Sequence, residues 1–214
     1  MEKKGIVKYN QYRQTKETKS GNGIKVLIEN RIIKFTMISI ITGVVRTSVV
    51  FWMPTFISQY LDFLPEQATA IFTVATLVIS MTAFVAVFLY ERLHRNMDLT
   101  ILIAFVAAAM FFCLVYFVKQ PVLNILFLVL AIMSSNCAAS MLWSRYCPSL
   151  RDTGMVSSAT GFLDFVSYMA ASVSSMIFAN AVSAIGWKNL ILVWLGLMLF
   201  GIVVSVPWKR SEKN

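Results

Sequence analysis

The stretch FTMISIITGVVRTSVVFWMPTF, residues 35–56, decides the fold of this chain, because it is long enough to cross a bilayer and carries one arginine near its centre. On insertion scales, a lone arginine at mid-depth in a membrane costs roughly 2.5–3.5 kcal/mol. A buried acid, an anionic ligand or water in a cavity has to offset that cost. We therefore expect Arg46 to take part in the function of the protein.

The composition is that of an integral membrane protein. Of the 214 residues, 58% are hydrophobic and 14% are charged, and the mean hydropathy is +0.72. The charges gather in short tracts between long apolar runs, whereas a soluble domain disperses them. The net charge of +9 does not indicate nucleic-acid binding, because the basic residues lie in an N-terminal tract and in short loops, as on a surface facing anionic membrane lipids.

The apolar runs predict an all-α membrane protein with six transmembrane helices. Backbone groups in lipid have to be hydrogen-bonded internally, which favours helices. The expected helices are at about 35–60, 68–90, 99–118, 121–143, 154–182 and 187–208. Residues 1–34 form a basic lead-in whose segment IKVLIENRIIK lies along the membrane surface, and residues 209–214 form a tail.

The distribution of lysine and arginine predicts the orientation. Sixteen of these residues fall in the lead-in, in the second and fourth loops and in the tail, and two, Lys119 and Lys188, fall in the opposite loops. The basic side faces the cytoplasm by the positive-inside rule. Both termini should therefore be cytoplasmic, in a multi-pass protein of the cell membrane.

Two charged residues lie inside predicted membrane segments, Arg46 in the first and Asp164 in the fifth. Each lies ten or eleven residues into a helix that runs outward, so we expect them at similar depth. One interpretation is a structural ion pair that fixes helix register. The other is a site in which Arg46 binds an anionic substrate while Asp164 balances the charge or carries a proton.

Three uncharged residues are further candidates for a substrate site. Asn136 either lines a cavity or hydrogen-bonds a neighbouring helix. Trp52, which we place on roughly the same face as Arg46, either walls that cavity or packs. Tyr168 is one turn beyond Asp164 and is positioned to donate a hydrogen bond to it.

The third and sixth predicted helices are more uniformly apolar than the other four. The other four carry many Ser, Thr, Asn, Gly or Ala residues. We expect the third and sixth helices to face lipid and the others to face protein or a water-filled interior.

No pattern indicates an enzyme, a metal site or a cofactor. The three cysteines have no CxxC spacing and are typical of small packing residues. The only histidine, His94, lies in a basic loop without a second ligand nearby. Nucleophile, zinc and phosphate-loop motifs are absent from the sequence.

From about residue 30 to 210 the chain resembles the C-terminal half of a major facilitator superfamily transporter, in the spacing of its six helices and its basic lead-in. The stretch VVRTSVVFWMPTFIS looks like the seventh helix of the organophosphate:phosphate antiporter branch, with Arg46, Trp52, Pro54 and Thr55 matching an arginine followed by Trp-x-Pro-Thr. The stretch GMVSSATGFLDFVSYMAASVSSMIF is similar to the eleventh helix of that family. The resemblance implies that Arg46 binds the anionic group of the substrate.

Two departures from the family pattern bear on mechanism. The segment VFLYERLHRN is a degraded form of the family's motif between helices, in which Glu91, Arg92 and Arg95 keep charged positions of a cytoplasmic gating loop. Asp164 replaces a small or neutral residue, which favours proton coupling over pure phosphate exchange.

The resemblance implies half of a secondary active transporter that moves a small anionic organic solute by alternating access. The superfamily places its substrate between two six-helix halves. We therefore expect a missing N-terminal half, encoded in the same gene or on a partner chain, or a homodimer. The alternative is a truncated remnant or accessory subunit that packs against another membrane protein without transporting anything.

Overall fold

The computed structural model describes residues 23–206, and this part of the chain consists of helices and short turns without any β-strand. The predictions for residues 1–22 and 207–214 fall outside the described residues. In chain order the helices are α2 (Gly23–Glu29), α3 (Ile32–Tyr60), α4 (Pro65–Ser80), α5 (Thr82–Arg92), α6 (Met97–Phe117), α7 (Pro121–Met141), a π-helical turn (Leu142–Tyr146), α8 (Cys147–Ser149), a 3-10 turn (Arg151–Thr153) and α9 (Val156–Ser205).

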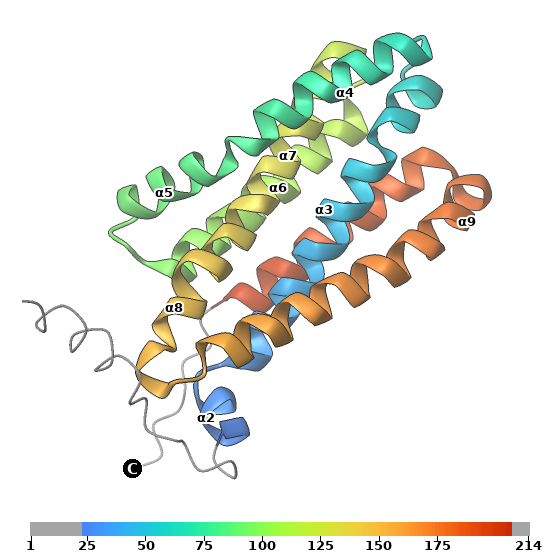
Figure 1. The fold of residues 1–214 in the computed structure, drawn as a ribbon. Helices are drawn as coiled ribbons and strands as arrows, with labels where there is room; N and C mark the ends of the chain where they lie inside the picture. The colour runs from blue at the N-terminus through green and yellow to red at the C-terminus, as the bar shows by residue number, and fades with distance from the viewer. Residues whose placement is uncertain (1–22, 207–214) are drawn as a thin grey trace, which may run out of the picture.

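The predicted all-α membrane architecture is confirmed. Within residues 23–206, five helical stretches are long and apolar enough to cross a membrane, and the last of them, α9, contains a break. Gly186 interrupts α9 with φ 74° and ψ 166°, a conformation that only glycine adopts readily. The chain reverses direction at this break (Figure 1), so α9 supplies two membrane-crossing segments.

The segment predicted to lie along the membrane surface is divided between two helices. Residues 23–29 form α2, and α3 begins at Ile32, three residues before the predicted start. Arg31 separates the two helices with a left-handed φ of 64°.

The second predicted helix is broken near its middle. It begins earlier than predicted because Pro65 occupies the first helical position, where its missing N–H costs nothing. At Met81 the helix changes from α4 to α5. The hydroxyls of Ser80 and Thr82 donate to the carbonyls of Leu77 and Ile79 there, so side chains bind backbone at the break.

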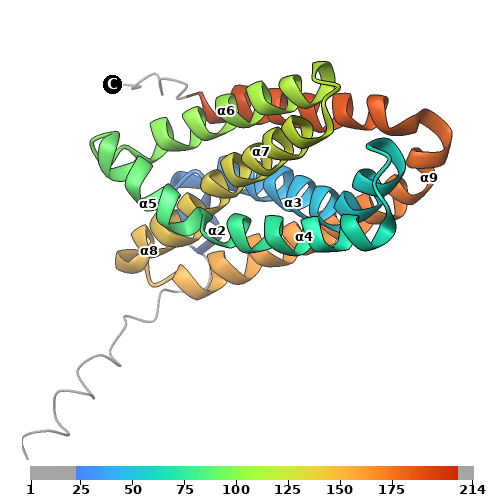
Figure 2. The same ribbon diagram turned by 90° about the horizontal axis from the view of Figure 1, so that it is seen from above.

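The helices form a bundle in which α3 and α7 lie in the middle (Figure 2). In this view α4 and the first half of α9 run along one side, and α6 and the end of α9 run along the other. The tightest neighbours are α3 with α9, α6 with α7, and α6 with α9.

The exposed large side chains of α6 and of the end of α9 are apolar, as expected for surfaces that face lipid; they include Val106, Met110, Leu199 and Phe200. However, α4 and α5 are exposed to a greater extent than predicted. Only five of their side chains are buried: Ala68, Ala75, Ile79, Thr82 and Ala86.

A tryptophan occupies the centre of the packing between α3, α6 and α9. Trp194 is buried, and its indole N–H donates to the Ser48 hydroxyl at 3.1 Å. The ring centroids of Phe112 in α6 and of Phe178 in the first half of α9 each lie 6.0 Å from that of Trp194. These contacts join both halves of α9 to the helix that carries Arg46.

The helix α3 and the first half of α9 approach each other through small side chains. The Ser39 hydroxyl donates to the Leu163 carbonyl at 2.9 Å. Four residues on, a Cβ added to Gly43 would lie 3.1 Å from the Ser167 carbonyl oxygen and would overlap the Ser167 hydroxyl. Small residues at such contacts allow helices in membranes to pack closely.

Asp98 and Lys34 together join three helix ends at the end of the bundle that holds Arg31 and Lys34, which we call the basic end. Asp98 at the start of α6 accepts from Arg31 at 2.8 Å and from Lys34 at 2.9 Å. Lys34 also donates to the Ser205 carbonyl at the end of α9, at 3.0 Å. These are the ion pairs of residues 23–206, and sequence reasoning did not identify Asp98 as their centre.

We expect Asp98→Asn to lower the free energy of unfolding by about 1 kcal/mol, the upper range for ion pairs open to solvent. The variant removes the charge that both cations share, and 1 M salt should shrink the difference from wild type. Thermal unfolding in detergent measures this effect. Asp152→Asn, at an exposed position without an ion pair to another described residue, is the control. Equal losses in the two variants would contradict the assignment.

Candidate functional site

Arg46 and Asn136, two residues singled out from the sequence, line the same open cavity of about 620 Å³. The cavity lies between α3, α4 and α7, and we call it the Arg46 cavity. It is lined by Arg46, Thr47, Val50, Phe51, Pro54, Phe72, Ile79 and Asn136. Its volume is in the range of roughly 300–1,000 Å³ that is usual for small-molecule sites.

Helix periodicity explains most of the lining. Arg46, Val50 and Pro54 recur every fourth residue on α3, which places them along one face. Phe72 and Ile79 are seven residues apart on α4 and therefore also share a face. Asn136 reaches the cavity from α7. The arginine is thus held between walls from two other helices.

The Arg46 guanidinium has no ion-pair partner among residues 23–206 and makes no hydrogen bond to another described side chain or carbonyl. The side chain is half-buried within a membrane-crossing helix. All five N–H donors of this guanidinium are therefore free to bind a group outside residues 23–206. The cavity is the place where a partner for those donors can lie.

Asn136 adds polar capacity to the same cavity. Its side-chain carbonyl oxygen is buried and has no hydrogen-bond partner among residues 23–206. Buried polar atoms are rarely left in this condition, since the loss of water is not offset. The hydroxyl of Thr47, next to Arg46, also makes no hydrogen bond within the described residues. The cavity therefore presents a cation, a hydroxyl and an amide, all without partners.

Asp164 and Tyr168 do not lie in the Arg46 cavity. Both are exposed on the first half of α9. The contacts between Ser39 and Leu163 and between Gly43 and Ser167 set the register of α3 on α9. Arg46 is therefore level with residue 170, and Asp164 is displaced by six residues, or about 9 Å along the helix.

The expectation that Arg46 and Asp164 share a depth is corrected by this register. Their side chains form no ion pair, although their helices are neighbours. The predicted depths were counted from the predicted helix starts. They were wrong because α3 begins earlier than expected and α9 begins later. No hydrogen bond joins Tyr168 to Asp164 either.

Trp52 also lies outside the Arg46 cavity. Its ring is 6.4 Å from that of Trp187 and 5.6 Å from that of Phe51. Six residues rotate a helix by about 240°, so Trp52 does not share the face of Arg46 as we expected. Its buried indole N–H has no hydrogen-bond partner in the described part of the chain. Of the two interpretations, packing describes its surroundings.

The three charged residues of the predicted gating loop are exposed at the basic end. Glu91 and Arg92 close α5, and Arg95 follows in a turn with a left-handed φ of 58°. None of them forms an ion pair with another described residue. Nearby, the Arg145 guanidinium lies 4.4 Å from the centre of the Tyr90 ring, which joins the end of α5 to the π-helical turn after α7.

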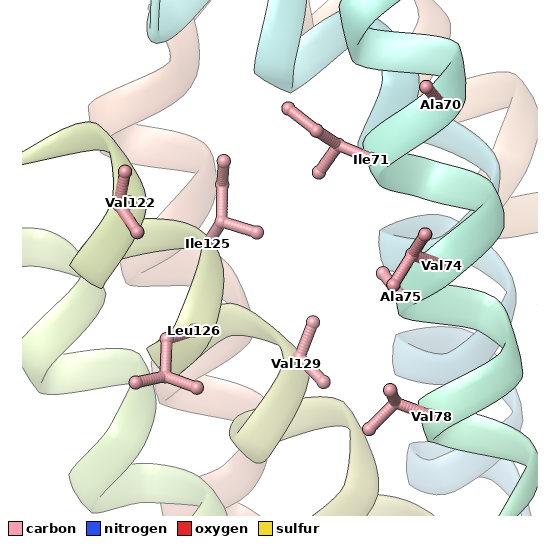
Figure 3. Close-up of a pocket in the computed structure, with 9 residues that line it drawn as sticks. All are labelled: Ala70, Ile71, Val74, Ala75, Val78, Val122, Ile125, Leu126 and Val129. Carbon is pink, nitrogen blue, oxygen red and sulfur yellow. The ribbon is translucent and has the colours of Figure 1, made fainter.

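A second groove of about 460 Å³ lies between α4 and α7, and its side chains are all apolar (Figure 3). It is lined by Ala70, Ile71, Val74, Ala75, Val78, Val122, Ile125, Leu126 and Val129. The absence of any polar group from its lining makes it unsuitable for an anion. The helices α4 and α7 thus contribute both to a cavity that contains a charge and to a groove whose side chains are all hydrocarbon.

Several lining residues were not proposed from the sequence, although helix spacing from Arg46 identifies some of them. Thr47, Val50 and Phe51 follow from the period of α3. Phe72 and Ile79 gave no signal, because their role depends on how α4 packs beside α3. Within residues 23–206, no group of three His, Cys, Asp or Glu residues is close enough to hold a metal ion.

Comparisons with protein-family models, with curated proteins and with solved structures found no match to this chain.

Proposed function

We propose that this chain is half of a secondary active transporter that moves a small organic anion across the cell membrane by alternating access. Arg46 contacts the anion, and Thr47 and Asn136 lie beside it. In this proposal the bundle is one half of a major facilitator superfamily transporter with both termini in the cytoplasm. The single observation that carries the proposal is the guanidinium of Arg46, which lies without a partner among the described residues in a cavity of a membrane-crossing helix bundle.

Exposed helix faces support a second half. The helices α4 and α5 and the first half of α9 bury few side chains and lie along the same side of the bundle (Figure 2). On α9 that exposed surface includes polar groups, among them Asp164, Ser172 and Asn180. Such groups are costly against lipid and are satisfied by protein or water. A six-helix partner, or a second copy of the chain, provides both.

The proposed test is uptake into liposomes. The protein, purified from its membrane with the partner bound, is reconstituted and given radiolabelled phenylacetate, inorganic phosphate or glucose 6-phosphate under an imposed pH gradient. Uptake of one anion that exceeds protein-free liposomes and requires Arg46 supports transport. Equal uptake in wild type and Arg46→Ala would contradict the anion site.

Asp164→Asn should flatten the dependence of uptake on the pH gradient, because Asp164 is the acid we assign to proton coupling or charge balance. The transport rate without a gradient should change less. Asp62→Asn, at an exposed position in a turn, is the matched control. An unchanged pH profile with a lower melting temperature would assign Asp164 a structural role instead.

The alternative function is an accessory membrane subunit or remnant that only packs against another membrane protein. The observation that favours it is the apolar character of the exposed faces. The exposed side chains there include Phe84 and Phe88 of α5 and Phe165 and Met176 of α9. Such surfaces suffice for packing without any ligand. Retention of partner binding in Arg46→Ala, together with no anion binding in wild type, would favour this function.

A further inference from the structure

The Arg46 cavity has one cation and a largely apolar wall, which restricts the chemistry of its ligand. This inference rests on the proposed function, in which Arg46 holds an anion. The polar groups of the wall are Arg46, Thr47 and Asn136, and the remaining lining is hydrocarbon. The composition of the wall therefore describes the ligand groups that contact this half of the site.

The charge of the wall matches a single negative charge. Arg46 is the one charged residue in the lining, and the carboxylate of Asp164 lies outside it. A phosphate monoester carries about −1.5 to −2 charges at neutral pH. A carboxylate carries one, and its two oxygens fit the fork of a guanidinium. The charge that this wall supplies thus balances a carboxylate and leaves a phosphate ester partly uncompensated.

The hydrocarbon of the wall is contributed by two helices. Phe51 and Pro54 of α3 and Phe72 and Ile79 of α4 lie around the cavity, with Val50 between Arg46 and Pro54. Aromatic side chains offer large contact areas to an apolar body and few hydrogen bonds. Contact with them is favourable for a ligand with an aromatic or aliphatic body.

The same wall is poorly suited to a sugar phosphate. Each sugar hydroxyl that loses water needs a donor or acceptor in the site. The wall offers the hydroxyl of Thr47 and the amide of Asn136, whose carbonyl oxygen has no partner. Two such groups satisfy one or two ligand hydroxyls, whereas a hexose has more. A site built to bind hydroxyls would carry further polar side chains in this wall.

We infer that the Arg46 cavity binds a small amphipathic monoanion, a carboxylate with an apolar body, in preference to a sugar phosphate or inorganic phosphate. The carboxylate lies against Arg46, with Asn136 and Thr47 beside it. The apolar body lies between Phe51 of α3 and Phe72 of α4.

The test compares four probes on the full chain, purified with its partner bound and placed in nanodiscs of phosphatidylcholine, where no anionic lipid competes for Arg46. Phenylacetate carries both the charge and the ring, phenylacetamide carries the ring alone, and glucose 6-phosphate and inorganic phosphate carry charge without an apolar body. Ligand binding raises the melting temperature by mass action. We expect phenylacetate to raise it in wild type, and we expect the other three to bind at least about tenfold more weakly, in line with the loss of one charged or apolar contact.

Substitutions in the wall separate the parts of the site. Phe51→Ala and Phe72→Ala should weaken phenylacetate binding about tenfold each, since each removes the burial of a large apolar contact. Phe51 is 68% exposed, so its truncation tests the site without disturbing the core. Phe84→Ala, at a position 76% exposed on α5 and outside the cavity, is the matched control and should bind phenylacetate as wild type does.

The outcomes distinguish this inference from the proposed function. Stabilisation by glucose 6-phosphate or phosphate that requires Arg46, without stabilisation by phenylacetate, would overturn the apolar-carboxylate assignment and leave the anion site standing. Equal effects of phenylacetate and phenylacetamide would overturn the role of the charge. Anion effects that persist in Arg46→Ala would overturn the proposed function itself.

Discussion

Arg46→Ala should weaken binding of an organic anion by about 10- to 150-fold, the range that corresponds to loss of a charged hydrogen-bonding group worth about 1.5–3 kcal/mol. The guanidinium has no partner among the described residues, so the loss of binding free energy comes from its contacts with the ligand alone. Uptake by the assembled protein should fall to the level of protein-free liposomes. The measurements are thermal shift with phenylacetate and uptake in proteoliposomes.

The same substitution should leave the ligand-free protein as stable as wild type, or more stable. Removal of a lone charge from a membrane-crossing helix relieves a cost, whereas breaking an ion pair strands the other partner. A melting temperature that falls in Arg46→Ala, and recovers in Arg46→Ala with Asp164→Asn, would instead indicate a structural pair.

Two variants serve as controls for Arg46→Ala. Arg46→Lys keeps the charge and loses the planar fork, so it should bind with intermediate affinity. Arg145→Ala removes an exposed arginine that lies over the Tyr90 ring at the basic end, and it should bind the anion as wild type does. Equal loss in Arg145→Ala would point to a general charge effect.

Gly43→Leu should strongly destabilise the helix bundle. A Cβ at position 43 already overlaps Ser167 on α9, and the remaining atoms of leucine would push the two helices apart. Overpacking typically costs about 1–3 kcal/mol and occasionally more. Because the contact is partly to backbone, we expect the upper part of that range, with a large fall in melting temperature and loss of a monodisperse peak in gel filtration.

Two glycines of α9 provide the control for Gly43→Leu, which lies in α3. A Cβ added to Gly161 or Gly196 meets no atom within 4 Å. Gly196→Leu should therefore be neutral or slightly stabilising, since leucine has a higher helix propensity than glycine by up to about 1 kcal/mol. A similar loss of stability in Gly43→Leu and Gly196→Leu would exclude close helix packing at position 43 as the cause.

The membrane fold was predictable from the sequence because apolar length alone determines which segments cross a bilayer. The crossings follow the predicted ranges closely, and Gly186 falls in the short gap between the last two. The break at Met81 was not predictable, since Ser80 and Thr82 bind backbone carbonyls as such residues do in many unbroken helices. The start of α3 was displaced because the basic residues around it are also typical of a loop at a membrane surface.

The candidate site was predicted in part. Arg46 and Asn136 were identified because polar residues in apolar segments are costly and need a reason. Their meeting in one cavity depends on how α3 and α7 pack, which periodicity does not reveal. Asp164 and Trp52 were misplaced for geometric reasons, namely an error in helix register for Asp164 and a rotation of about 240° for Trp52. The place of Phe72 in the cavity depends on how α4 packs beside α3, and no sequence pattern indicated it.

The ends of the bundle are held together by different kinds of contact. At the basic end, Asp98 joins Arg31 and Lys34 through directional bonds of fixed length. At the other end, Phe56 and Trp52 meet Trp187 ring against ring, with no hydrogen bond between them. Aromatic pairs are favourable over a range of ring-centroid separations of about 4.5–7 Å, whereas a charge-assisted hydrogen bond requires a separation of about 2.7–2.9 Å. The register of the helices is therefore fixed more strictly at the basic end, where the contacts are directional, than at the end that holds Trp187.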